Sequence, residues 1–200
     1  MVRIGVTGGI GSGKSIVCNL LRLYGIPVFD ADQEAKCLND TSTEVREALI
    51  HHFGESLYEG DKLDRRRFAT LIFNDKRNLT VANAVIHPAL AKRFNDWCSA
   101  RSCFTHVAID APVLFEAGFD AYVETVVTVY APKKLRVKRV MQRDQVDREK
   151  VEARMRSQLP EQEKLKRADH VIHNDDCHSL IVQVADFLAG ISFFNEDSAG

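Results

Sequence analysis

The sequence predicts an α/β fold, in which a parallel β-sheet is flanked by helices and interrupted by a helical insertion. Short apolar runs recur near both ends of the chain, and such runs are typical of parallel strands buried on both faces. From about residue 31 to 104, apolar residues instead return every three or four positions, which is typical of helices. A glycine-rich stretch at residues 8–15 joins the first apolar run to a helix-like segment.

Each element can be justified in chain order. Strands are expected at residues 2–7, 26–30, 107–110, 126–130 and 170–173. One helix is expected from Ile16, and another from Pro132, because the first helical position needs no N–H donor. An amphipathic helix at about 179–188 completes the fold, and residues 195–200 are expected to fray.

These elements predict one domain with three parts. The core comprises about residues 1–30, 105–141 and 169–200, and the helical insertion comprises about residues 31–104. The remaining stretch, about 142–168, is highly charged, sparsely apolar and broken by Pro160. Two short helices with little core are expected there, which suits a mobile lid.

The composition limits the classes of partner. The chain has 27 lysines and arginines against 28 aspartates and glutamates, so no overall field favours nucleic acid or an anionic membrane. Its five cysteines form no Cys-x-x-Cys pair, which is typical of reduced thiols in a cytosol. No apolar run approaches the roughly 20 residues of a membrane span, and a strand follows Met1 with no room for a signal peptide. We therefore expect a cytoplasmic monomer or weak homo-oligomer that binds neither nucleic acid nor membranes.

The glycine-rich stretch fits G-x-x-x-x-G-K-[ST], the P-loop pattern of NTPases. A chain that wraps a polyphosphate points successive N–H groups inward, which requires glycines and a helix N-terminus aimed at the anion. The lysine then acts on the β- and γ-phosphates, where it is catalytic, and the serine hydroxyl ligates Mg²⁺. The expected ATP contacts are Gly9, Ile10, Gly11, Ser12, Gly13, Lys14 and Ser15. An ordinary glycine-rich turn is the alternative.

Carboxylates follow two further strands of the expected sheet. Asp110 ends the third strand and is expected to hold Mg²⁺ together with Ser15, directly or through water, unless it only caps the next turn. Asp30 and Asp32 follow the second strand, whose carboxyl end meets the P-loop at one edge of a parallel sheet. One of them is a candidate base for an acceptor hydroxyl, and the alternative is that they cap a helix starting near Gln33.

A cationic run follows the strand at residues 126–130. It contains Lys133, Lys134, Arg136, Lys138, Arg139 and Arg143. Arg139 and Arg143 are four residues apart, so they share a helix face at the entrance to the expected lid. Planar guanidinium groups there would close over a transferring phosphoryl group. For the three lysines, a solvated basic face is the better interpretation.

Other classes of function fit less well. His170, His173, Cys177 and His178 have the chemistry of zinc ligands, but residues 170 and 173 of one strand point to opposite faces. A GTPase switch needs Asn-Lys-x-Asp, and the nearest string, at residues 74–77, does not match. A module that binds ATP only structurally would not need Asp32 and Arg143 at one phosphate site. Another small-molecule kinase, for a nucleoside or nucleotide, remains the alternative, because P-loop kinases share the phosphate machinery.

The chain resembles the dephospho-CoA kinase family over nearly its whole length. The likeness is carried by residues 5–15, 30–32, 63–65, 86–88, 110–116, 142–144 and 168–174. The P-loop is generic, whereas Asp-Ala-Asp, His-Pro and Leu-Phe-Glu in this order and spacing are specific. The resemblance implies a P-loop kinase with a helical CoA-binding insertion and a helical lid. The implied reaction transfers the γ-phosphoryl group of ATP to the ribose 3′-hydroxyl of dephospho-CoA.

The resemblance also implies roles for single residues. Asp32 matches the base, Arg143 the lid arginine, and Asn174 lies where the adenine of ATP is held. The implied acceptor contacts are Asp32, Arg65, His87, Leu114, Phe115 and Glu116. The alternative for His87 is that His-Pro only marks a helix start. Ile16 and Val113 replace a usual threonine and leucine, and neither change removes a functional group.

Overall fold

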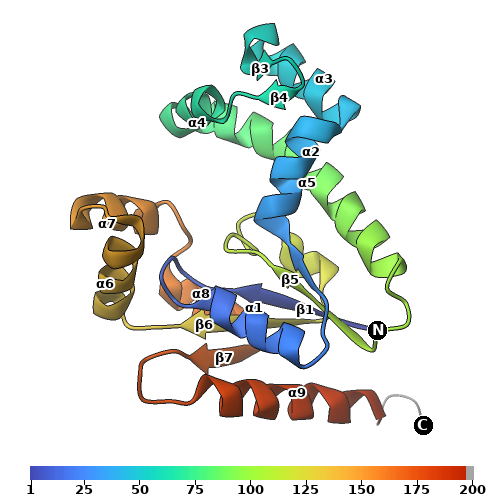
Figure 1. Ribbon diagram of the computed structural model, residues 1–200, viewed down its shortest axis with the longest axis vertical. Helices are drawn as coiled ribbons and strands as arrows, with labels where there is room; N and C mark the ends of the chain where they lie inside the picture. Colours follow the sequence, from blue (N-terminus) through green and yellow to red (C-terminus); the bar gives the residue numbers. More distant parts are fainter. Residues whose placement is uncertain (197–200) are drawn as a thin grey trace. The chain divides into compact units, whose positions relative to one another are not determined.

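The computed structural model describes the backbone of residues 1–196 and the side chains of residues 1–191 (Figure 1). The chain divides into two compact units. The first consists of Met1–Val28 with Cys103–Gly200, and the second of Phe29–Ser102. Residues 197–200 of the tail that we expected to fray lie outside the described part.

A five-stranded parallel sheet forms the centre of the fold. Its strands are β1 (Val2–Thr7), β2 (Val28–Asp30), β5 (His106–Asp110), β6 (Thr125–Tyr130) and β7 (His170–His173). Their order is β2-β5-β1-β6-β7, and the boundary between the units falls within β2. Central β1 pairs with β5 from Val2↔His106 to Val6↔Asp110, and with β6 on its other side. The predicted α/β class with a parallel sheet is therefore confirmed.

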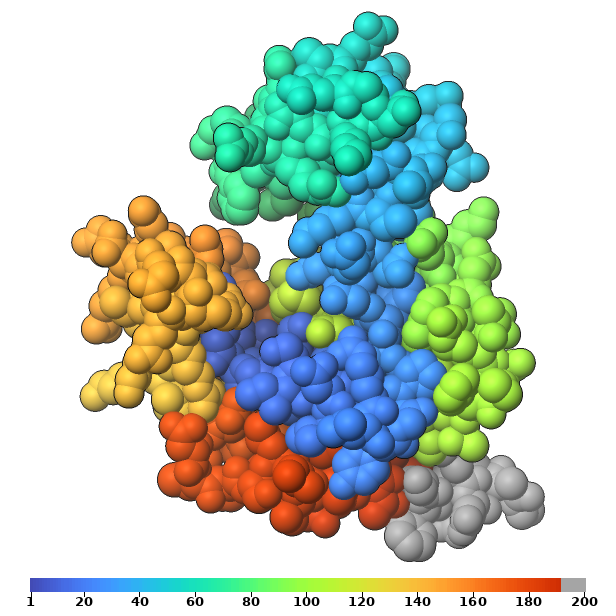
Figure 2. Space-filling model, in the orientation of Figure 1, coloured from blue at the N-terminus to red at the C-terminus, as the bar shows by residue number. Residues whose placement is uncertain are grey.

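Two helices, α1 (Lys14–Leu23) and α9 (Leu180–Glu196), cover one face of this sheet. Strand residues Ile4 and Val6 are fully buried in the same apolar cluster as Leu21 of α1 and Phe187 of α9. The two helices contact each other and lie side by side on the surface in Figure 2. Our expectation that the last helix ends near residue 188 is wrong, because burial of its apolar residues on both sides of Gly190 outweighs the low helix propensity of glycine.

Three helices follow β6: α6 (Lys133–Asp144), α7 (Arg148–Arg156) and α8 (Glu161–Arg167). Pro132 caps α6 instead of being its first residue. Helices α6 and α7 form a lobe at the edge of the first unit in Figure 2 and share a small apolar cluster around Val140 and Val151. Helix α8 packs on β6 and buries Lys164 completely, so the expectation of little core over the whole stretch 142–168 is wrong for α8.

The second unit is mainly helical. Its helices are α2 (Ala31–Thr41), α3 (Thr43–Phe53), η1 (Glu55–Leu57), α4 (Arg65–Asn74) and α5 (Lys76–Ser99), and its own core includes Leu49, Leu57 and Phe68. The expectation of helix throughout is wrong, because β3 (Tyr58–Glu59) and β4 (Lys62–Leu63) form an antiparallel hairpin. Gly60, with φ 58°, opens its two-residue turn, a position that favours glycine.

Helix α5 also corrects our expectation about His87-Pro88. It runs unbroken from Lys76 to Ser99, so His87 lies inside a helix and not at a helix start. Proline removes one helical hydrogen bond, but burial of Ala82 before it and Leu90 after it holds both halves of the helix in place. Among the described residues, no helix is long and apolar enough to cross a membrane.

Candidate active site

The P-loop connects β1 to α1 in the way its sequence predicts. Lys14 is the first residue of α1, and Gly13 precedes it as the N-cap with φ 92°. A side chain at Gly13 would overlap the amide nitrogen of Asn174, so both the backbone angle and the close approach require glycine. The N-terminus of α1, which attracts anions, therefore opens onto the loop.

Asn174 and Arg139, which were both expected at ATP, lie together beside this loop. Asn174 Nδ2 donates a hydrogen bond to the Ser12 carbonyl at 2.7 Å, and the Asn174 side chain is buried. Arg139 donates to the Asn174 carbonyl at 3.1 Å and forms an ion pair with Asp176 at 2.7 Å. The structure thus brings the loop after β7 and helix α6 to the P-loop.

Lys14 and Asp110 form an ion pair. Asp110 ends β5, the direct neighbour of β1, so the two strands place the carboxylate next to the start of α1. Ser15 follows Lys14 in the same helical turn. Within residues 1–191, no group of three or more His, Cys, Asp or Glu side chains gathers into a metal site. The Ser15 hydroxyl and the Asp110 carboxylate are nevertheless hard oxygen donors, and one or two protein oxygens with substrate phosphates suit Mg²⁺.

Arg143, expected in the lid, lies at the end of α6 and is 64% exposed. Its guanidinium donates to both carboxylate oxygens of Asp144, at 2.7 and 3.2 Å, and Asp144 also accepts from Arg154 at 2.8 Å. The hydrogen bond from Arg143 is the main reason why the pKa of Asp144 lies below its usual value. Of the three arginines on α6, Arg136 lies directly over the P-loop, and Arg139 contacts Asn174 beside it.

Sequence analysis gave that residue, Arg136, no role. Its side chain is 9% exposed and forms an ion pair with Glu161 of α8 at 2.6 Å. Both groups lie so close over Gly9 that a side chain there would collide with them. Burial raises the pKa of Glu161, against the lowering effects of Arg136 and Lys164. The sequence did contain a signal for the position of Arg136. Residues 136, 139 and 143 follow the i, i+3, i+7 spacing of one helix face, so Arg136 is expected on the same face as the two arginines assigned to ATP.

The Leu114-Phe115-Glu116 segment follows β5 in the first unit. Leu114 is fully buried beside Gly5 of β1, and Phe115 is buried with the Arg167 guanidinium 4.3 Å from its ring centre. Glu116 is the member with polar contacts. Its Oε1 accepts the Leu159 N–H at 2.7 Å and lies 3.2 Å from Lys164 Nζ.

The second unit carries the other expected acceptor residues. Asp30 caps α2, because its carboxylate accepts the Gln33 N–H at 2.9 Å, so the helix begins at Ala31 and not near Gln33. Asp32 therefore lies in the first turn of α2 and is not the cap. Arg65 forms an ion pair with Asp40 at 2.6 Å. Because residues 32 and 40 are two turns apart, Arg65 contacts the same face of α2 that carries Asp32.

His87 lies on α5 of the second unit and is partly buried. Desolvation on burial lowers its pKa below the usual 6.5. A neutral imidazole at neutral pH is the consequence, since the charged form is disfavoured.

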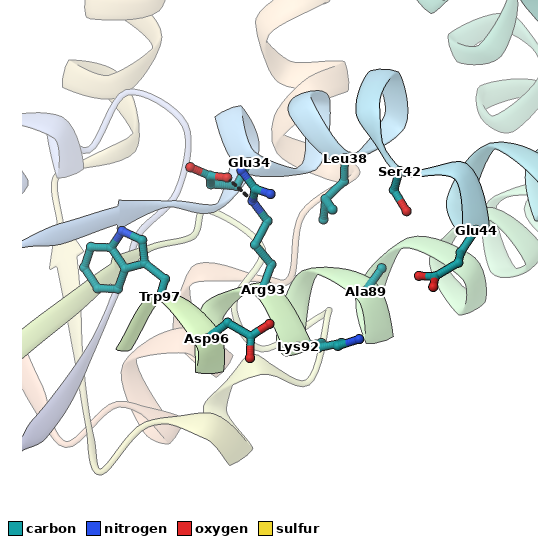
Figure 3. Close-up of a pocket in the computed structure, with 9 residues that line it drawn as sticks. All are labelled: Glu34, Leu38, Ser42, Glu44, Ala89, Lys92, Arg93, Asp96 and Trp97. Carbon is teal, nitrogen blue, oxygen red and sulfur yellow. Dashed lines mark hydrogen bonds and ion pairs between the residues drawn. The ribbon is translucent and has the colours of Figure 1, made fainter. Parts of the chain in front are cut away.

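A pocket of about 380 Å³ in the second unit was not expected from the sequence (Figure 3). It is lined by Glu34, Leu38, Ser42, Glu44, Ala89, Lys92, Arg93, Asp96 and Trp97. Figure 3 shows Arg93 reaching from α5 to Glu34 of α2, where the two side chains form an ion pair. Glu34 and Leu38 occupy a different face of α2 from Asp32, so the pocket and the expected base lie on separate sides of that helix.

Among the histidines considered as zinc ligands, His173 and His178 have ring centres 5.7 Å apart, but the described residues contain no group of three His, Cys, Asp or Glu side chains that could hold a metal. His170 packs on Phe187, His173 packs on Tyr130, and His178 pairs with Asp175 at 2.9 Å. Hydrogen bonds from the His178 side chain and, secondly, from the Cys177 N–H lower the pKa of Asp175 from 3.8 to about 2.

Comparison with known proteins identifies the family. The family model described as Dephospho-CoA kinase matches residues 2–179. A dephospho-CoA kinase of Porphyromonas gingivalis (strain ATCC BAA-308 / W83) is 44% identical over 188 residues, which are 92% of this chain and 91% of that protein. The crystal structure of TT1252 from Thermus thermophilus is 38% identical, with a TM-score of 0.80 and 95% of each chain covered.

A dephospho-CoA kinase structure from Campylobacter jejuni is 26% identical, with a TM-score of 0.68 and coverage of 96% of this chain and 98% of that one. The resemblance seen in the motifs therefore extends to the whole fold. The chain belongs to the dephospho-CoA kinase family.

Proposed function

We propose that this chain transfers the γ-phosphoryl group of ATP to the ribose 3′-hydroxyl of dephospho-CoA, giving coenzyme A and ADP. The observation that carries the proposal is the P-loop itself, in a chain of this family, with Lys14 at the N-terminus of α1 and Asp110 paired to it. Phosphoryl transfer depends mainly on positioning and on charge stabilisation, and this arrangement supplies both.

On the phosphate side, we assign the binding of ATP to the loop and its neighbours. The N–H groups of Gly11, Gly13, Lys14 and Ser15 would bind the phosphate oxygens, since they lead into a helix N-terminus. The Ile10 N–H donates to Gln158 and the Ser12 N–H to the Gly9 carbonyl. Lys14 stabilises the charge that develops on the transferring group, and Arg143 closes over it as a planar donor. Arg139 and Asn174 hold the nucleotide, and their contacts with each other and with Ser12 support that assignment.

Kinases of this kind act on ATP with a divalent cation, and we propose Mg²⁺. The Ser15 hydroxyl and the Asp110 carboxylate would hold it, with phosphate oxygens completing its shell. When bound, Mg²⁺ neutralises charge on the β- and γ-phosphate oxygens.

On the acceptor side, we assign the base to Asp32. A ribose hydroxyl has a pKa far above neutrality, so a carboxylate that orients it and takes its proton favours transfer. Arg65 on the same helix face and Glu116 after β5 are proposed to bind the acceptor, together with His87, Leu114 and Phe115. Because Asp30 already caps α2, the capping role does not account for Asp32.

We further propose that the protein works in the cytoplasm, as a monomer or a weak homo-oligomer. Its near-zero net charge and cysteines without disulfides support this assignment.

A panel of acceptors tests the proposed function. Dephospho-CoA, adenosine, AMP and shikimate are each incubated with ATP and Mg²⁺, and ADP release is measured. We expect dephospho-CoA to give by far the highest kcat/KM, with a 3′-phosphate in the product by NMR. Faster phosphorylation of adenosine or AMP would replace the proposal by a nucleoside or nucleotide kinase. The control is the Lys14→Ala variant, purified in the same way, because any ADP release that it shows comes from a contaminating kinase.

A further inference from the structure

Helix α8 carries a lysine that is completely buried. The Lys164 side chain is 0% exposed. Its ammonium donates a hydrogen bond to the Pro112 carbonyl at 2.8 Å and lies 3.2 Å from Glu116 Oε1. A buried charge is costly unless it is paired and hydrogen-bonded, and here both partners belong to the segment that follows β5. The charge of Lys164 therefore acts on this segment, and it also acts on Glu161 of the same helix, whose pKa burial raises and the Lys164 charge lowers.

The carboxylate of Glu116 is held from two sides. Besides the Lys164 ammonium, its Oε1 accepts the N–H of Leu159, which lies between α7 and α8. The hydrogen bond from Leu159 and the closest approach of the Lys164 ammonium both fall on Oε1. Oε2 is therefore left to accept a hydrogen bond from a ligand.

The segment that carries Lys164 also contacts the P-loop. Gln158 Oε1 accepts the Ile10 N–H at 2.9 Å, and Glu161 lies over Gly9 with Arg136. The seven residues from 158 to 164 thus contact both the phosphate-binding loop and the segment that carries Glu116. These residues therefore connect the P-loop to the segment after β5 within the first unit.

We propose that Lys164 is a positioning residue for the acceptor. Its buried ammonium fixes Glu116 through Oε1 and the backbone through Pro112, so that Glu116 Oε2 is presented to a hydroxyl or N–H donor of the acceptor. This inference rests on the proposed function, in which Glu116 binds dephospho-CoA. It assigns to Lys164 a role in acceptor affinity, whereas Glu161 of the same helix lies at the P-loop.

Substitution of Lys164 by methionine tests the proposal. Lys164→Met removes the ammonium and keeps most of the side-chain volume. The matched control is Lys166→Met, because Lys166 is 71% exposed on the same helix. We expect Lys164→Met to raise the KM for dephospho-CoA by about tenfold, the equivalent of one charge-assisted hydrogen bond, while the KM for ATP changes less than about twofold. An unchanged acceptor KM, or equal rises for both substrates, overturns the proposal.

A double-mutant cycle with Glu116→Gln separates positioning from a general loss of packing. If Lys164 acts through Glu116, the acceptor KM of the double variant equals that of the worse single variant. If the fold-increases in the acceptor KM of the two single variants instead multiply in the double variant, the two residues act independently and the proposal is overturned. If Lys164→Met does not fold, Lys164→Gln, which keeps a donor for the Pro112 carbonyl, enters the same cycle. Wild-type activity is measured alongside. Its absence refutes the proposed function and this inference together, whereas an active wild type with an unaffected Lys164→Met refutes the inference alone.

Discussion

The two units hold their chemically important side chains in different ways. In the first unit, the ion pairs at the P-loop are nearly buried: the side chains of Lys14 and Asp110 are 16% and 12% exposed. In the second unit, Arg65 and Arg93 are 49% and 41% exposed in their pairs with Asp40 and Glu34. Pairs that are shielded from water are fixed more firmly than exposed ones. The Lys14–Asp110 pair at the P-loop is therefore held more firmly than the two arginine pairs of the second unit.

This difference suggests a division of labour. Phosphate binding needs the same geometry in every P-loop kinase, so a rigid arrangement suits it. Acceptor recognition distinguishes one kinase from another, and we propose that here it depends on the insertion and on the segment after β5. Substitutions in the two units should then affect different steps, which the following predictions test.

The largest effect is expected for Lys14→Ala. Removing this donor withdraws stabilisation from the charge that develops in the transition state, so kcat should fall about a hundredfold or more. Lys133→Ala is the control, because Lys133 is also a lysine near a helix start but is 64% exposed. Steady-state kinetics with both substrates measures the effect. Near-normal turnover of Lys14→Ala would refute the role of the P-loop in catalysis.

Asp32→Asn should lower kcat by roughly a hundredfold, because it keeps the shape but removes the base. The affinity for ATP and the thermal stability should change little. Asp30→Asn serves as the control, since asparagine caps helices about as well as aspartate. The assignment moves to Asp30 if the control loses activity and Asp32→Asn keeps it. If ATP binding and transfer fall together in Asp32→Asn, the residue belongs to the metal site instead.

Arg143→Lys should reduce kcat by about tenfold, because an ammonium does not reproduce the planar fork and one charge-assisted hydrogen bond is lost. Arg148→Lys is the matched control on α7, where Arg148 pairs with Glu152 at 3.0 Å and is 68% exposed. The measurement is single-turnover transfer at saturating ATP. Full activity of Arg143→Lys would show that Arg143 is only part of a solvated basic helix face and has no role in transfer.

The smallest expected effect concerns the pH dependence of stability. Burial lowers the pKa of His87, so the unfolded chain takes up a proton more readily than the folded chain. His87 therefore contributes stability above pH 6.5 that is lost as the pH falls below it. We expect Tm of His87→Gln to depend less steeply on pH than that of the wild type between about pH 5 and pH 7.

His106→Gln makes the matched comparison in the first unit. Burial, and secondly the N-terminal ammonium, lower the pKa of His106 as well, so its variant should show the same flattening of the Tm profile. Only His87→Gln should also raise the KM for dephospho-CoA, if His87 contacts the acceptor. A pH profile of His87→Gln identical to that of the wild type would contradict the first part of this prediction.

Local patterns predicted the sheet and the P-loop well. β-branched apolar runs predict strands such as β1 and β6, and the P-loop motif alone predicts the positions of Gly13 and Lys14 at the start of α1. The hairpin of β3 and β4 was missed because two-residue strands are too short to show an alternating pattern. The only local signal was Gly60-Asp61, a glycine-led turn.

Long-range burial could not be predicted. Lys164 and its partner Pro112 are 52 residues apart, and Arg136 meets Glu161 only after α7 has intervened. In the sequence, Lys164 and Arg136 belong to charged stretches of the kind that usually face solvent. The end of β2 at Asp30 was predicted, but the start of α2 at Ala31 was not, because periodicity places a helix boundary only within a few residues.

The most direct test of the division of labour is a calorimetric titration of two matched arginine variants with each substrate. Arg139 and Arg65 both pair with an aspartate, at 2.7 and 2.6 Å, one in each unit. We predict that Arg139→Ala weakens ATP binding by about tenfold and leaves dephospho-CoA binding unchanged, and that Arg65→Ala does the reverse. Equal weakening of both substrates by either variant, or no weakening by both, would contradict the account.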